Sequence, residues 1–190
     1  MKLPSIVAIL VFCASPSMAH TGLGDTSGFA HGLAHPIFGV DHLLAMVAVG
    51  LWSGFILPGR CWAGAAAFLS AMVLGAGLSW AGVGIPMVES WIVLSVVVFG
   101  LLTLTGRRGQ PQGHTRASLA AIALFALCHG HAHATEATGN AFAYLGGFLL
   151  STSALHLVGI AIARSIAGRP IVQRVLGAGV AVSGLFLMVG

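Results

Sequence analysis

The sequence predicts an all-α integral membrane protein, a bundle of six transmembrane helices behind a cleavable signal peptide. Of its 190 residues, 57% are hydrophobic and only 6% are charged, whereas roughly a quarter of the residues in an ordinary soluble domain are charged. Long apolar runs repeat along the chain between short segments of Gly, Pro, Arg or His, and each run is close to the ~20 residues that span a bilayer. We therefore expect lipid to surround most of the protein.

Residues 1–19 have the features of a secretory signal peptide. Lys2 precedes an apolar stretch over residues 6–14, and Ser-Met-Ala at residues 17–19 matches a small-x-small cleavage site. An uncleaved anchor is the weaker alternative, because the apolar stretch is too short to span a bilayer. Cleavage would leave residues 20–190 as a single six-helix transmembrane domain.

Six apolar runs predict the transmembrane helices, and the arginines predict their orientation. The runs cover residues 37–57, 62–82, 88–105, 117–134, 141–163 and 171–189. All seven arginines fall in or within a few residues of the loops after the first, third and fifth runs, and loops rich in Lys and Arg stay in the cytoplasm. This topology predicts a multi-pass protein of the bacterial inner membrane with both mature termini in the periplasm.

The net charge of +4 does not indicate a nucleic-acid partner, because the basic residues lack the clustered face that phosphate binding requires. The tryptophans lie near helix ends, as in an interfacial aromatic belt, at Trp52, Trp62, Trp80 and Trp91. Small residues recur within the helices and favour close packing. The sequence leaves the oligomeric state open, with a homo-oligomer as one alternative.

Nine histidines and four acidic residues are the candidates for function, because ionisable groups in a membrane are costly and usually mark a site or a pathway. Most lie before or near the outer ends of the first and fourth predicted helices. The first group is His20, His31, His35, Asp41, His42 and Met46, and the second is His129, His131, His133 and Glu136. His156 lies deep in the fifth helix. Hydrogen bonding between helices is the structural alternative for any single histidine.

The histidines of the first helix share one stripe, but a regular helix does not bring them to one ion. His35 and His42 are seven residues apart, or ~10.5 Å along a helix axis, whereas metal–nitrogen bonds are ~2 Å long. Pro36 and Gly39 favour a broken helix, and the alternative is a ladder of stations for a moving ion. On a regular helix the side chain of Asp41 points ~100° away from that of His42. Asp41 could therefore contact another helix, support a metal ligand from behind, or lie in a distorted turn.

The second group also shares a helix face. His129 and His133 are four residues apart and Glu136 follows three later, while His131 faces elsewhere. Imidazole and carboxylate groups with Met or Cys nearby suit nickel, cobalt, copper or zinc, whereas magnesium and calcium prefer shells of oxygen. The sequence therefore predicts a site for a divalent transition metal.

Two motifs and one later histidine carry a family resemblance. They are His35-Pro36-x-x-Gly39-x-Asp41-His42-x-x-x-Met46, His129-Gly-x-Ala-His133-x-x-Glu136, and His156. This pattern resembles the HupE/UreJ family of nickel and cobalt permeases over essentially the whole mature chain. The resemblance implies uptake of Ni²⁺, or sometimes Co²⁺, across the inner membrane for hydrogenase, urease or cobalt-cofactor assembly. It also implies roles in transport for His35, Asp41 and His42.

Other functions remain open at this stage. Cu²⁺ and Zn²⁺ are alternative cargoes, and a metal exporter or a metal-delivery accessory protein would have nearly the same signature. A membrane haem protein with two axial histidines is an alternative of a different class. We do not expect an enzyme, because the sequence has no His-Glu-x-x-His motif and no Ser or Cys nucleophile motif.

Overall fold

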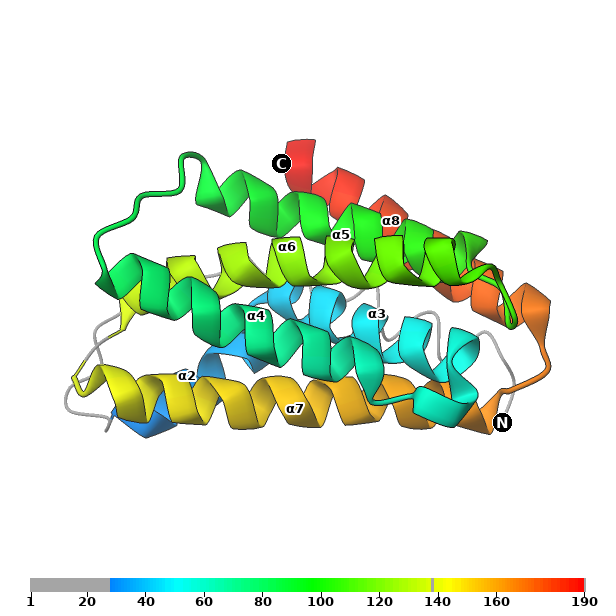
Figure 1. Ribbon diagram of the computed structural model, residues 1–190, viewed down its shortest axis with the longest axis horizontal. Helices are drawn as coiled ribbons and strands as arrows, with labels where there is room; N and C mark the ends of the chain where they lie inside the picture. Colours follow the sequence, from blue (N-terminus) through cyan, green and yellow to red (C-terminus); the bar gives the residue numbers. More distant parts are fainter. Residues whose placement is uncertain (1–27, 138, 190) are drawn as a thin grey trace.

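The structure is a computed structural model that describes residues 28–137 and 139–189. These residues form seven α-helices and one 3-10 turn, with no strand. The helices are α2 (Gly28–Phe38), α3 (Val40–Ile56), α4 (Ala63–Trp80), α5 (Val88–Thr105), α6 (Gln112–Glu136), α7 (Ala141–Ser165) and α8 (Pro170–Val189), and the turn is η1 (Pro58–Arg60). They form one elongated bundle (Figure 1). The all-α prediction is confirmed, while the signal peptide and His20 lie outside the described residues.

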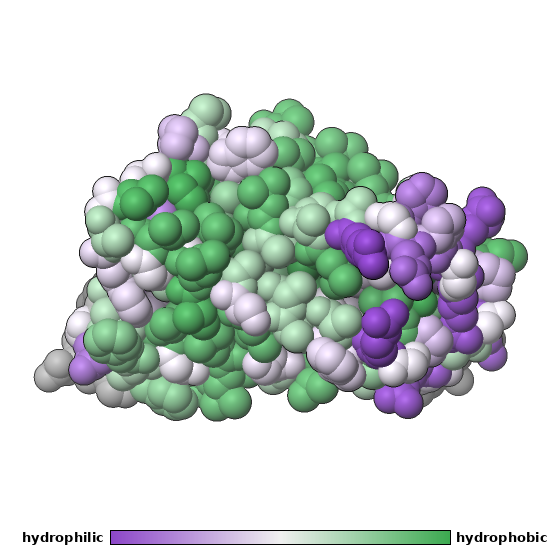
Figure 2. Space-filling view, in the orientation of Figure 1, coloured by the Kyte–Doolittle hydropathy of each residue, from purple (hydrophilic) through white to green (hydrophobic). Residues whose placement is uncertain are grey.

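Five of these helices, α4 to α8, are long and apolar enough to cross a membrane, judged by length and composition. A sixth crossing results if α2 and α3 together form one bent span. The helices lie close to the predicted runs, although α6 begins five residues earlier than the predicted start at residue 117. Apolar side chains cover much of the flank of the bundle (Figure 2). This surface is typical of a protein surrounded by lipid.

The arginines gather at one end of the bundle. All seven are exposed, and they lie on η1, in the α5–α6 loop, and near the ends of α6, α7 and α8 that meet there. Hydrophilic side chains accordingly concentrate at the right of Figure 2. The structure thus groups the three arginine-bearing loops as predicted, and the assignment of this end to the cytoplasm stays a prediction.

The first predicted helix is broken. Its residues divide between α2 and α3, whose axes differ by 77°. Pro36 lies in the last turn of α2, where it supplies no backbone N–H. Gly39 then adopts an extended conformation with φ −80° and ψ 111°. Of the two alternatives for this segment, the structure shows the break.

Helix α3 forms the centre of the core. From Ala48 to Ile56 every residue is buried, and α3 packs mainly against α7 and α5. Trp52 is only 1% exposed, so its assignment to an interfacial belt is wrong. Trp52 lies on α3, and the other helices of the bundle pack around α3. Trp62, Trp80 and Trp91 are exposed, as an interfacial position requires.

Helices α3 and α7 approach so closely that only glycine fits at their crossing. A Cβ atom on Gly50 would overlap the carbonyl oxygen of His156, and one on Gly159 would overlap that of Val47. This contact fixes the height of His156 relative to α3. Close approach of this kind is a common way for membrane helices to associate.

Replacing Gly50 by Ala should destabilise the bundle by about 1–3 kcal/mol, because the added methyl forces α3 and α7 apart. Thermal denaturation of the detergent-solubilised protein should show a lower midpoint. Gly179→Ala in α8 is the matched control, since a Cβ atom there meets nothing within 4 Å. Equal midpoints for the two variants would contradict this account of the crossing.

Candidate metal centre

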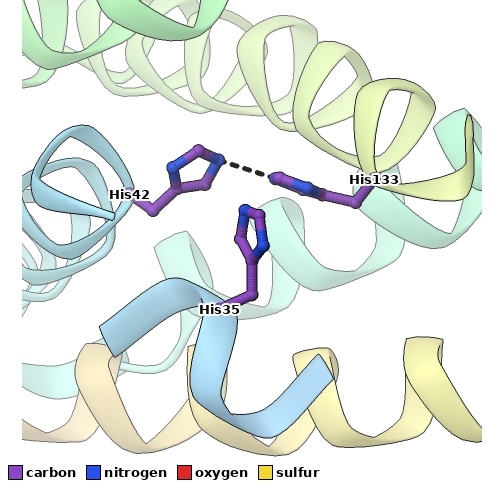
Figure 3. A group of neighbouring side chains, drawn as sticks. All are labelled: His35, His42 and His133. Atoms are coloured by element: carbon purple, nitrogen blue, oxygen red, sulfur yellow. Dashed lines mark hydrogen bonds between the residues drawn. The ribbon is translucent and has the colours of Figure 1, made fainter. Parts of the chain in front are cut away.

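Three histidines from three helices converge at one point. His35 lies on α2, His42 on α3 and His133 on α6. One ring nitrogen from each residue lies within 4.8 Å of the ring nitrogens of the other two. Figure 3 shows the three rings pointing toward the same place. The Nε2 atoms of His42 and His133 are 2.6 Å apart. We call these three residues the histidine cluster.

The break between α2 and α3 makes this convergence geometrically feasible. A continuous helix would separate His35 and His42 by ~10.5 Å along its axis. In the structure their ring centroids are 5.3 Å apart, and those of His35 and His133 are 4.7 Å apart. The cluster is well enclosed, because His42 and His133 are buried and the side chain of His35 is 25% exposed.

Two carboxylates hold the buried rings in place. Oδ1 of Asp41 accepts hydrogen bonds from Nδ1 of His42 at 2.7 Å and from the His42 backbone N–H at 2.8 Å. On the other side, Oε2 of Glu136 lies 3.2 Å from Nδ1 of His133 and 3.9 Å from Nε2 of His35. Metal-binding histidines commonly donate their second ring N–H to a carboxylate, which fixes their tautomer. Asp41 thus lies behind the ring of His42 as seen from the cluster, in agreement with one of the three alternatives for this residue.

This arrangement directs electron pairs into the centre of the cluster. Since a carboxylate only accepts, the Nδ1 atoms of His42 and His133 carry the protons, and each Nε2 presents a lone pair. Two lone pairs at 2.6 Å repel unless a proton or a cation lies between them. A metal with bonds of ~2.0–2.1 Å would hold the two nitrogens about 2.9–3.4 Å apart. A small rotation of either ring would therefore admit a divalent cation.

Gly39 leaves room for this arrangement. A Cβ atom at this position would lie 2.9 Å from Nδ1 of His42 and 3.2 Å from Oδ1 of Asp41. Its φ of −80° is open to any residue, so the requirement for glycine is space for the Asp41–His42 pair. The sequence indicates a break here but does not reveal this steric role.

Three other predicted residues lie near the cluster. His129 is one turn before His133 on α6, and its ring centroid is 5.3 Å from that of His42. His31 lies one turn before His35 on α2, with ring centroids 6.2 Å apart. Met46, one turn beyond His42, is fully buried in the core.

Two predicted residues lie away from the cluster. Nε2 of His131 donates to the carbonyl oxygen of Val83, in the loop between α4 and α5, at 2.6 Å. This confirms that His131 faces away from its neighbours on α6. His156 is buried in the middle of α7, where its Nδ1 donates to the carbonyl oxygen of Thr152 at 2.7 Å.

Aromatic side chains of α7 line the cluster. They were not among the candidate residues predicted from the sequence. The ring of Phe148 lies 4.2 Å from that of His133 and 6.0 Å from that of His35, between centroids. Tyr144, one turn earlier, lies 5.5 Å from His31. The sequence marks Tyr144 and Phe148 only by their spacing of four residues, which is common to the apolar face of any packed helix. They place the ring nitrogens of the cluster in a largely apolar surrounding.

The fold and this site define a class: a multi-pass helical membrane protein with a buried histidine cluster backed by carboxylates. The model of one family, described as HupE / UreJ protein, matches residues 8–187. The chain is also 38% identical to Protein HupE of Rhizobium leguminosarum bv. viciae, and the alignment covers all of both chains. The chain therefore belongs to the HupE/UreJ family, which confirms the resemblance. No solved structure matches.

Asp41→Asn should weaken nickel binding about 10–100-fold, because the ring of His42 loses the charge that fixes its tautomer. Isothermal titration of the detergent-solubilised protein with Ni²⁺ measures this affinity. His114→Ala, at an exposed position near the arginine end, is the control and should bind nickel like the wild type. An unchanged affinity in Asp41→Asn would remove Asp41 from the site.

Gly39→Ala should also weaken nickel binding, by about tenfold or more, since the added methyl displaces the Asp41–His42 pair. The same titration applies. Gly146→Ala on α7 is the matched substitution, because a Cβ atom there meets nothing within 4 Å. Equal affinities in the two alanine variants would show that the space beside Gly39 is unimportant.

Proposed function

We propose that this protein is an inner-membrane permease that imports a divalent transition metal, with nickel as the first candidate and cobalt as the second. The observation that carries the proposal is the meeting of His35, His42 and His133 from three helices inside an apolar bundle. Nitrogen donors of this kind suit Ni²⁺, Co²⁺, Cu²⁺ and Zn²⁺. Membership of the HupE/UreJ family favours nickel and cobalt within that series.

The break in the helix supports a role in transport. Non-helical backbone at membrane depth is tolerated where it is buried in protein or lines a cavity, and transporters often place ion sites at such interrupted helices. Here the interruption at Gly39 separates the two helices that carry His35 and His42. A site built from two half-helices can change its geometry as they move.

Import fits the position of the cluster within the bundle. The arginines lie at the opposite end, and the positive-inside rule assigns that end to the cytoplasm. The histidine cluster then lies in the periplasmic half, where it would capture ions from outside. We further propose that residues 1–19 are removed as a signal peptide, that both mature termini are periplasmic, and that the imported metal serves hydrogenase or urease maturation.

A haem site is disfavoured by the same geometry. Two axial imidazoles on one iron hold their nitrogens about 4 Å apart, with a flat macrocycle between them. The Nε2 atoms of His42 and His133 are 2.6 Å apart, and their ring centroids are 4.5 Å apart. The packing of Phe148 against His133 closes the remaining space. A Soret band in the purified protein would overturn this conclusion.

His42→Ala and Asp41→Ala should each abolish uptake of labelled nickel by cells that lack other nickel importers. The first substitution removes a ligand, and the second removes the carboxylate that orients it. His114→Ala should transport like the wild type, with membrane levels of all variants compared by immunoblotting.

The direction of the change separates the alternatives. An exporter would make the His42→Ala cells accumulate more nickel than the wild type, whereas an importer makes them accumulate less. Wild-type uptake in both His42→Ala and Asp41→Ala would exclude the cluster from transport. Competition with Co²⁺, Cu²⁺ and Zn²⁺ in the same assay identifies the preferred metal.

A further inference from the structure

Two more histidines, His129 on α6 and His156 on α7, are buried in the core of the bundle and are not members of the histidine cluster. Both are 0% exposed. Nδ1 of His129 donates to the carbonyl oxygen of Phe125 at 2.9 Å, and Nδ1 of His156 donates to that of Thr152 at 2.7 Å. Since a carbonyl only accepts, Nδ1 carries the proton and Nε2 the lone pair in both rings. We call these residues the deep pair.

The lone pairs of the deep pair are unused. Neither Nε2 atom has a hydrogen-bond partner among the described residues, and the hydroxyl of Thr152 also lacks one. A buried polar atom left unpaired costs about 1–3 kcal/mol, and most buried side-chain polar atoms are paired. Neither ring links its helix to another through a hydrogen bond, since each Nδ1 bonds to a carbonyl oxygen of its own helix. Two imidazoles that each leave a nitrogen bare are instead suited to receive a ligand.

One aromatic ring contacts both members of the pair. Phe68 on α4 is fully buried, and its ring centroid lies 5.3 Å from that of His129 and 5.1 Å from that of His156. His129 in turn lies 5.3 Å from His42 of the histidine cluster. Successive ring contacts therefore connect His42 of the cluster to His156 in the middle of α7, and the ring of Phe68 is the one apolar member of this series.

We propose that His129 and His156 form a second, deeper station for the transported metal, and that the side chain of Phe68 is the gate between them. This inference rests on the proposed function of the protein as a metal permease. Rotation of the Phe68 ring out of the series would bring the cation from His129 into reach of His156. The hydroxyl of Thr152, one turn from His156 on α7, or water would complete the shell.

The two stations differ in charge. In the histidine cluster Asp41 and Glu136 lie behind the ligands, whereas the rings of the deep pair bond only to backbone carbonyls. Because no carboxylate is hydrogen-bonded to either ring of the deep pair, less negative charge offsets a dication there, so it binds more weakly than at the histidine cluster. Conduction requires that an ion bind well enough to enter and weakly enough to leave. The deep pair is suited to the second requirement.

The test compares nickel stoichiometry with nickel uptake. In equilibrium dialysis of the purified full-length protein against Ni²⁺, the wild type should bind at the histidine cluster. Phe68→Ala should bind an additional ion per chain, and Phe68→Ala combined with His156→Ala should lose that ion. Phe68→Leu, which keeps an apolar side chain, gives a second variant should the alanine variant fail to fold.

His156→Ala and His156→Gln should keep the ion of the histidine cluster at wild-type affinity yet lose uptake in cells. This separation of binding from transport is a result that general damage to the fold would not produce. His114→Ala again serves as the control for both measurements.

The outcomes distinguish this inference from the proposed function. If the wild type binds no nickel, the permease itself is excluded. If the wild type binds nickel, two results would each overturn the deep station alone. One is wild-type uptake by both His156 variants, and the other is the absence of an additional ion in folded Phe68 variants.

Discussion

The break at Gly39 is the constraint on which the site depends. Without it, His35 and His42 would remain about two turns apart on one helix, and no ion could bind both. The angle of 77° between α2 and α3 orients the short helix α2 so that the ring of His35 lies beside the ring of His42. The backbone at the break stays hydrogen-bonded, because the N–H of Gly39 donates to the carbonyl oxygen of His35 and the N–H of Leu43 donates to that of Gly39. A helix-breaking pair, Pro36 and Gly39, is therefore also the structural basis of the cluster.

Composition and spacing predicted the helices but not the pairing of their side chains. The apolar runs located α4 to α8, because a bilayer demands runs of that length. Pro36 and Gly39 marked the break as one of two alternatives. The contact between His42 and His133 joins residues 91 positions apart, and no local pattern determines which faces of α3 and α6 meet. Trp52 was misplaced for the same reason, since proximity to a helix end does not reveal that α3 is surrounded by other helices.

The site also shows why residue type alone misassigns roles. Asp41 and the histidines appeared as equal candidates in the sequence. The structure instead separates them by position: His42 presents Nε2 to the centre, while Asp41 holds Nδ1 from behind. Phe68 and Phe148 carry no chemical signal, yet each lies against the imidazole rings. The role of an apolar residue in a site depends on which side chains surround it in space, and the sequence alone does not give those neighbours.

The distribution of charge gives the bundle a direction. The carboxylates that contact histidines lie near the cluster, and the arginines lie at the other end. A cation therefore meets its strongest compensating charge where α2, α3 and α6 converge, and less compensation at each ring farther along the series. Because Coulomb interactions are strong in a medium of low dielectric constant, even a few ångströms of separation from Asp41 and Glu136 changes the affinity for a dication. If metal passes along these rings as proposed, the placement of the two carboxylates makes successive sites weaker, and movement of the Phe68 ring controls passage between them.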